Sequence, residues 1–151
     1  MAERLSIDRI LVVIDGTETG VRAARFAAQM AAIQGAELTG LAVVDTATLT
    51  SLLKKSVLVE AEMEEFGDEL ESSARTNLNY FTRLAEEAGV RSQTLLRKGS
   101  AHWTVIDEVK RLEPDLLVMG SFTTSTIQRD LNARERRLIV DEVQCPIILV
   151  P

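Results

Sequence analysis

The segment from Val118 to Arg137, VMGSFTTSTIQRDLNARERR, combines residue types that bind phosphate groups. An apolar run ends at Gly120, hydroxyl residues follow, and four arginines come next. Glycine lets backbone amides approach an anion, while hydroxyl and guanidinium groups donate hydrogen bonds to phosphate oxygens. No second glycine follows in this segment, so the backbone part of such a site is incomplete.

Alternating apolar and amphipathic segments must position these residues. Short apolar runs bounded by charged or turn residues predict buried strands, and the segments between them have helical spacing. The expected strands cover Arg9–Asp15, Ala36–Asp45, Val90–Gly99, Asp115–Gly120 and Cys145–Pro151, and the expected helices cover residues 16–35, 60–89, 100–113 and 126–143. Residues 46–59 show no clear period and predict a loop or a short helix.

The alternation of strand and helix predicts one α/β domain covering residues 1–151. Its core is a five-stranded parallel sheet of flavodoxin-like or Rossmann-like type, with right-handed crossovers and helices on both faces. Ligands of such sheets bind beyond the carboxyl ends of the strands, where the strand order reverses. The residues at those ends are Asp15 and Gly16, Val44 and Asp45, Lys98 and Gly99, and Met119 and Gly120.

Composition narrows the classes of function. The formal net charge is −6 and aromatic residues make up only 4% of the chain, so the core is expected to be aliphatic. An acidic chain without a basic face is a poor candidate for nucleic acid, and no segment reaches the length of a membrane span. The single cysteine, Cys145, and an N-terminus without a secretory signal indicate a reducing cytoplasm.

Other potentially reactive side chains have structural explanations. His102 is the only histidine and has no nucleophile motif nearby, so no catalytic residue is expected. Trp103 is expected to pack at helical spacing with Ile106, and Cys145 to be a buried structural thiol, with redox sensing as the alternative. No group of His, Cys and carboxylate residues has metal-ligand spacing, so no metal site is expected.

The arginines at 129, 134, 136 and 137 alternate with acidic residues, and two interpretations stay open. The first is a salt-bridged helix surface, which is the ordinary arrangement of mixed charges. The second is an anion site at the end of the fourth strand.

Five motifs in register make the chain resemble the universal stress protein family over nearly its whole length. They are ILVVIDGTE at Ile10–Glu18, GAELTGLAVVD at Gly35–Asp45, KGSA at Lys98–Ala101, PDLLVMGS at Pro114–Ser121 and CPIILV at Cys145–Val150. The resemblance implies a homodimeric protein of the stress response with five parallel strands. One branch of the family binds ATP and another does not.

The ATP-binding branch carries the motif G-x2-G-x9-G-[S/T] after the fourth strand, and the resemblance places it on this chain position by position. The first glycine matches Gly120, the second falls on Thr123, the third on Ala133, and the hydroxyl residue on Arg134. Thr123 adds a branched side chain where bare backbone is expected. Arg134 either bridges to an anion or fills the phosphate pocket.

The nucleoside half of the family's pocket is better matched. The resemblance places Asp15 at the ribose end and Val43 where the backbone contacts adenine, while an N-cap role is the alternative for Asp15. Gly16 and Thr17 open a helix whose amides can meet an anion. The remaining candidates around Gly120 are Met119, Ser121 and Thr124.

These observations lead to three functional hypotheses. The first is a cytoplasmic, dimeric regulatory module of the stress response that is not an enzyme and does not bind ATP in the family's usual way; weak ATPase activity stays open. The second is a protein that binds ATP, AMP or a cyclic nucleotide through Arg134, Ser121 and Thr124 instead of glycine amides. The third is a pocket for a different small anion or a cyclic nucleotide, with Asp15 at one end and the arginines at the other.

The last apolar segment predicts the dimer interface. In the strand order 3-2-1-4-5 it lies at an edge of the sheet, and a bare apolar edge strand invites pairing. The family pairs this strand with its copy in a second subunit, and antiparallel pairing of identical strands is self-complementary. The expected interface residues are Pro146, Ile147, Ile148, Leu149 and Val150.

Overall fold

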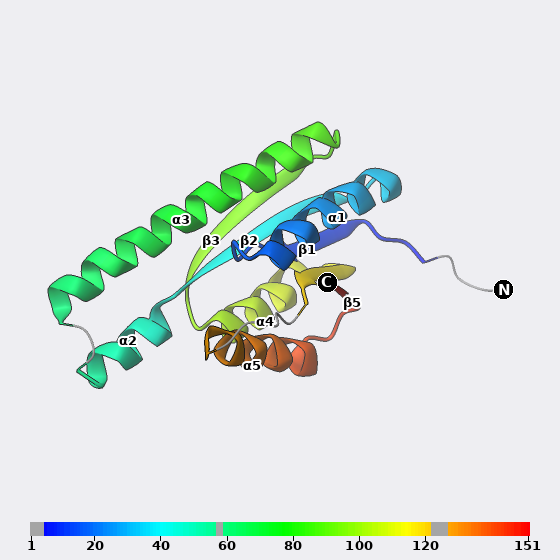
Figure 1. Ribbon diagram of the computed structural model, residues 1–151. Helices are drawn as coiled ribbons and strands as arrows, with labels where there is room; N and C mark the ends of the chain where they lie inside the picture. The colour runs from blue at the N-terminus through cyan, green and yellow to red at the C-terminus, as the bar shows by residue number, and fades with distance from the viewer. Residues whose placement is uncertain (1–4, 57–58, 122–126) are drawn as a thin grey trace.

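Five parallel strands form one sheet between two layers of helices (Figure 1). The computed structural model describes residues 5–56, 59–121 and 127–151, and their side chains except at 48 and 127–133. The strands are β1 (Arg9–Val13), β2 (Glu37–Asp45), β3 (Ser92–Gly99), β4 (Leu116–Gly120) and β5 (Ile147–Val150). Their order is β3-β2-β1-β4-β5, and every neighbouring pair is parallel, which confirms the predicted topology.

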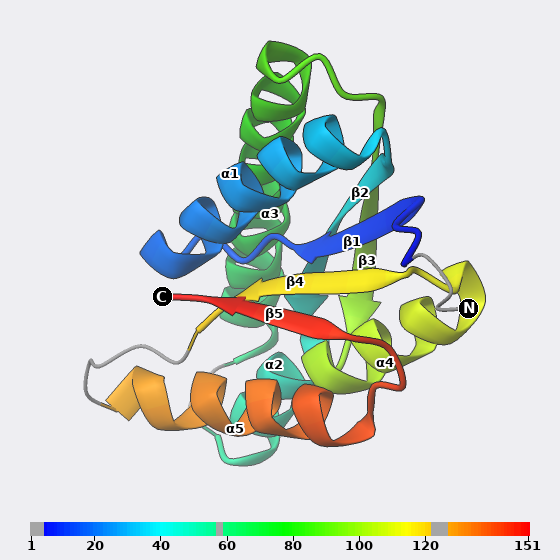
Figure 2. The ribbon, with the colours of Figure 1, turned by 90° about the vertical axis from the view of Figure 1, so that its right-hand side faces the viewer.

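Helices cover both faces of this sheet. They are α1 (Glu18–Gln34), α2 (Thr46–Lys54), α3 (Glu60–Glu87), α4 (Ala101–Leu112) and α5 (Ile127–Glu142). The core has one apolar cluster that α1 and α3 share with the sheet, and a second that α4 and α5 share with its other face. Figure 2 shows α1 and α5 on opposite sides of β4 and β5.

The core is aliphatic, as predicted, with one exception. Phe81 of α3 is fully buried and packs on β2 at Gly40, where a Cβ atom would lie 2.7 Å from the ring carbons. Every residue of β4 is buried, which explains its continuous apolar sequence. The expectation for Trp103 was wrong: it is 55% exposed, and its ring lies 5.1 Å from that of His102.

The long helix α3 has a packed half and a solvated half. All its buried residues, Leu78, Phe81 and Ala85, lie in the second half. The acidic first half is mostly exposed, as expected for a solvated face, and Gly67 does not interrupt it. The short-helix interpretation of residues 46–59 is also correct, because α2 forms there. No helix of the described ranges is long and apolar enough to cross a membrane.

Candidate functional site at the ends of β1 and β4

The carboxyl ends of β1 and β4 meet the first turn of α1. Thr17 is the N-cap of α1, and its hydroxyl accepts a hydrogen bond from the amide of Gly20 at 3.0 Å. Asp15 Oδ1 in turn accepts hydrogen bonds from the Thr17 amide at 3.1 Å and hydroxyl at 2.7 Å. The N-cap interpretation of Asp15 is therefore wrong. Thr17 caps the helix, and Asp15 orients the cap.

The tight turn before α1 requires glycine at position 16. Gly16 has a φ of 74°, in the left-handed region that side chains disfavour. A Cβ atom there would also lie 2.6 Å from Asn77 Nδ2 of α3. This conformation brings the Asp15 carboxylate back over the start of α1.

Arg136 of α5 fills the space between the two strand ends. Its Nη2 donates to Asp15 Oδ2 at 2.8 Å, and its Nη1 donates to the carbonyl oxygen of Ser121 at 2.8 Å. The Arg136 side chain is only 6% exposed, and that of Asp15 is 30% exposed. For this arginine the interpretation as part of a salt-bridged helix surface was wrong. The anion that it binds is the protein's own Asp15.

Arg136 is buried because it lies on the packed side of α5. Ile139 and Val143 follow it at spacings of three and seven residues, and both belong to or contact the core on the α4–α5 side. The spacing with Ile139 and Val143 was the signal in the sequence that could have identified Arg136. Arg134, the arginine chosen from the family motif, is instead exposed.

The other predicted site residues fall into three groups. Ser121 takes part through its backbone: its carbonyl accepts from Arg136 and from Thr19 Oγ1, the latter at 3.3 Å. Met119 and Val43 pack in the core on the α4–α5 side. Thr123 and Thr124 lie outside the described residues, as does the side chain of Ala133.

Gly120 allows β4 to approach α1 closely. A Cβ atom at this position would lie 2.5 Å from Thr19 Oγ1 and 2.8 Å from the amide nitrogen of Gly20. Its φ is not in the left-handed region, so the requirement concerns space alone. Gly120, the one glycine that matches the phosphate motif, is therefore required by the packing of β4 against α1, whether or not a ligand binds.

Glu135, next to Arg136 in the sequence, connects α5 to the start of α4. Its Oε2 accepts from the His102 amide at 2.9 Å and lies 2.6 Å from His102 Nδ1. Ser100 is the N-cap residue but makes no capping hydrogen bond through its side chain. Its hydroxyl lies 3.1 Å from the same Nδ1. In a hydrolytic triad the nucleophile and the acid bind opposite nitrogens of the histidine ring. Ser100 and Glu135 both lie at Nδ1 of His102, so this geometry does not support nucleophilic catalysis.

A second ion-pair cluster is structural. Glu108 of α4 is 7% exposed and contacts Arg97 of β3 and Arg111 of α4, at 2.8 and 2.6 Å. Burial raises the pKa of the Glu108 carboxyl, but the hydrogen bonds and charges of both arginines outweigh it and leave the pKa below its ordinary value. Among the described residues, no group of three or more His, Cys, Asp and Glu side chains is placed to hold a metal ion.

A doubly wound parallel sheet with polar side chains gathered between β1 and β4 defines a flavodoxin-like α/β domain with its crevice at the switch point of strand order. The model of the universal stress protein family matches residues 6–151. The chain belongs to the universal stress protein family.

Similar proteins align with nearly the whole chain. A universal stress protein of Methanocaldococcus jannaschii is 24% identical over 142 residues, which are 94% of this chain and 81% of the relative. The structure of the universal stress protein UspA from Lactobacillus plantarum has a TM-score of 0.79 at 22% identity and covers 98% of this chain and 100% of that chain. A universal stress protein in complex with cAMP has a TM-score of 0.71 at 18% identity, with coverages of 96% and 97%.

Proposed function

We propose that this protein is a non-catalytic regulatory module of the stress response whose nucleotide site is closed from within by Arg136. The observation that carries the proposal is the guanidinium of Arg136, which bridges Asp15 and the end of β4. Both carboxylate oxygens of Asp15 already accept hydrogen bonds from the protein itself. A cytoplasmic location and the absence of turnover are parts of the same proposal.

The ion pair opposes a nucleotide for an energetic reason. A ribose whose hydroxyl groups donate hydrogen bonds to Asp15 must displace the guanidinium or share the carboxylate with it. Separating the pair leaves a charge without its partner, and because the Asp15 side chain is 30% exposed the cost is about 2–3 kcal/mol, below that for a fully buried pair. The steric effect expected of Thr123 and Ala133 stays a prediction, because it concerns side chains outside the described part of the chain.

Calorimetry with ATP, AMP and cAMP tests this proposal. We expect no saturable heat for the unmodified protein at ligand concentrations up to about 1 mM, which corresponds to a binding free energy weaker than about −4 kcal/mol. Saturable ATP binding that disappears in Asp15→Ala would refute a closed site. Native mass spectrometry of the freshly purified protein would reveal a copurified nucleotide directly.

A second candidate function is binding of an adenine nucleotide with a single phosphate. One similar structure is a universal stress protein in complex with cAMP. The guanidinium of Arg136 can bind a phosphate group in place of the Asp15 carboxylate. In this case cAMP binds saturably and Arg136→Ala abolishes binding, whereas Arg134→Ala at the exposed position leaves it unchanged. That result would replace the first proposal with the second.

We also infer a homodimer through the edge strand β5. Leu149 is 38% exposed on this strand, whose outer edge pairs with no other described strand. Leu149→Glu is expected to convert a dimer into a monomer, because it places a charge in the apolar interface. Sedimentation velocity at micromolar concentration measures the mass. Val140→Glu on α5 is the matched control, since Val140 is also 38% exposed, and we expect it to stay dimeric.

A monomeric mass for the unmodified protein at the same concentration would refute the dimer. Equal dissociation of both variants would instead show that the surface of α5 contributes as much as β5.

A further inference from the structure

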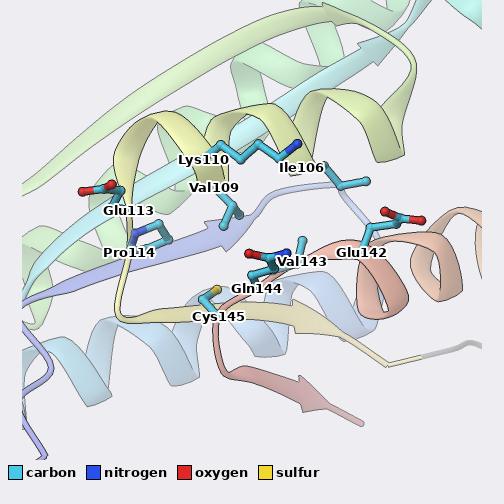
Figure 3. A pocket seen from close by; sticks show the side chains of 9 residues that line it. All are labelled: Ile106, Val109, Lys110, Glu113, Pro114, Glu142, Val143, Gln144 and Cys145. Carbon is cyan, nitrogen blue, oxygen red and sulfur yellow. The ribbon is translucent and has the colours of Figure 1, made fainter.

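A cavity of about 420 Å³ lies between the C-terminal ends of α4 and α5 (Figure 3). It is at the amino ends of β4 and β5, so it lies at the opposite edge of the sheet from the Asp15–Arg136 pair. Its volume is within the range of sites for small organic molecules. The lining residues are Ile106, Val109, Lys110, Glu113, Pro114, Glu142, Val143, Gln144 and Cys145.

The floor of the cavity is apolar and its rim is polar. Ile106 and Val109 of α4 are almost fully buried, and Val143 contacts the same apolar cluster. Figure 3 shows Val109 and Cys145 directed into the space between the two helices. Glu113 and Glu142 are exposed at the rim. A buried apolar floor with few polar groups at the opening is the usual composition of a ligand pocket.

The electrostatics of the rim favour positive charge. Two carboxylate side chains, Glu113 and Glu142, line the cavity together with one ammonium side chain, Lys110. Both helices also end at this cavity, and a helix C-terminus carries a partial negative charge. Among the described residues, no ion pair involves Glu113 or Glu142, so both carboxylates are available to a ligand.

We propose that the cavity between the C-terminal ends of α4 and α5 binds small organic cations that have an apolar body, such as quaternary ammonium compounds. The apolar part contacts Ile106, Val109 and Val143, while the cationic group lies at the rim that carries Glu113 and Glu142. This site is independent of the proposed function, because it shares no residue with the site at Asp15 and Arg136.

Cys145 is a built-in reporter for the charge preference of this cavity. It is the only cysteine of the chain and lines the cavity. A methanethiosulfonate reagent modifies it without an added oxidant: the thiolate attacks the reagent's sulfenyl sulfur, a mixed disulfide forms and methanesulfinate leaves. Burial raises the pKa of the Cys145 thiol, so the reaction is measured at about pH 8.5, near the ordinary thiol pKa.

The first experiment compares a trimethylammonium-ethyl reagent with a sulfonatoethyl reagent. The ratio of their rates in the native protein is divided by the ratio in the urea-unfolded chain, which removes the intrinsic difference between the reagents. We expect the native protein to favour the cation by on the order of tenfold at low salt, and less at high salt, where charges are screened. A native ratio equal to the unfolded one would overturn the proposal, as would complete protection of Cys145 from both reagents.

A charge-matched pair of variants separates the local effect from the protein's overall acidity. Glu113→Gln with Glu142→Gln should reduce the selectivity several-fold. Glu86→Gln with Glu87→Gln, at exposed positions near the end of α3, changes the net charge equally and should leave the selectivity unchanged. Circular dichroism verifies that both double variants fold. Equal losses in the two would show that overall charge, rather than the cavity, attracts the cation.

The second experiment detects binding itself. Benzyltrimethylammonium at millimolar concentration should slow the reaction of Cys145 with the neutral reagent methyl methanethiosulfonate at least twofold, whereas benzenesulfonate, which has the same ring and the opposite charge, should not. Protection by both compounds would show an apolar pocket without charge preference, and protection by neither would show no pocket ligand of this class. Each result contradicts the proposal.

Discussion

Replacing Arg136 with alanine is expected to lower the free energy of unfolding by about 2–3 kcal/mol. The change removes the two short hydrogen bonds of a nearly buried guanidinium and a longer one to Thr17, and it leaves the Asp15 carboxylate and the Ser121 carbonyl without this donor. The estimate is below the usual cost of breaking a buried pair because the side chain of Asp15 is 30% exposed, so water can reach it in the variant. Urea denaturation with an unchanged m-value measures the effect.

The control for this prediction is two residues away on the same helix. Arg134→Ala removes an identical side chain from an exposed position and should change stability by less than about 0.5 kcal/mol. A double-mutant cycle of Asp15→Ala and Arg136→Ala isolates the pair and should give a coupling energy of about 1–3 kcal/mol. Equal effects of the two single arginine variants, together with no coupling, would mean that the ion pair does not form in solution.

Replacing Gly120 with alanine should destabilise the protein by about 1–3 kcal/mol. The added methyl group would meet the backbone of α1 at Thr19 and Gly20, and backbone atoms cannot move aside as the end of a flexible side chain can. An alanine at an ordinary φ would otherwise stabilise the chain slightly, by restricting the unfolded state. A destabilisation in the absence of any nucleotide therefore identifies Gly120 as a structural glycine.

Gly67→Ala is the matched control for Gly120. Gly67 lies inside α3, and a Cβ atom there would have only an ordinary contact, at 3.6 Å from a carbon of Leu49. The substitution is expected to stabilise the protein by about 0.5–1 kcal/mol, because alanine favours helix over glycine. Thermal unfolding of both variants shows whether each substitution raises or lowers the stability. A neutral or stabilising Gly120→Ala would show that β4 and α1 can separate without cost.

The strands and helices could be predicted from the sequence because the residue patterns that indicate them are local. A strand buried on both faces, such as β4, is a continuous apolar run, and the alternation with helices restricts the sheet to few topologies. The end of β4 at Gly120 was therefore located correctly, whereas β1 ends at Val13, two residues before the predicted end at Asp15. The short helix α2 was the weakest prediction, since its sequence has no clear period.

The candidate site could be predicted only in part, because its decisive contact joins residues distant in the sequence. Arg136 and Asp15 are 121 residues apart, and the spacing of Arg136 with Ile139 and Val143 indicates the packed side of α5 without identifying Asp15 as the partner. Alignment with a family motif selected Arg134 by position, whereas the orientation of α5 selects Arg136. Trp103 was misplaced for a similar reason: its spacing from Ile106 is helical, yet it lies on the exposed side of α4.

Two adjacent residues of α5, Glu135 and Arg136, contact different neighbours. One binds the first turn of α4 and the other the loop after β1. Successive helical residues project about 100° apart, so a single turn holds both attachments. Rotation of α5 that releases Asp15 must therefore disturb the amide of His102 as well. The first turn of α4 and the loop after β1 are thus held by adjacent residues of a single turn of α5.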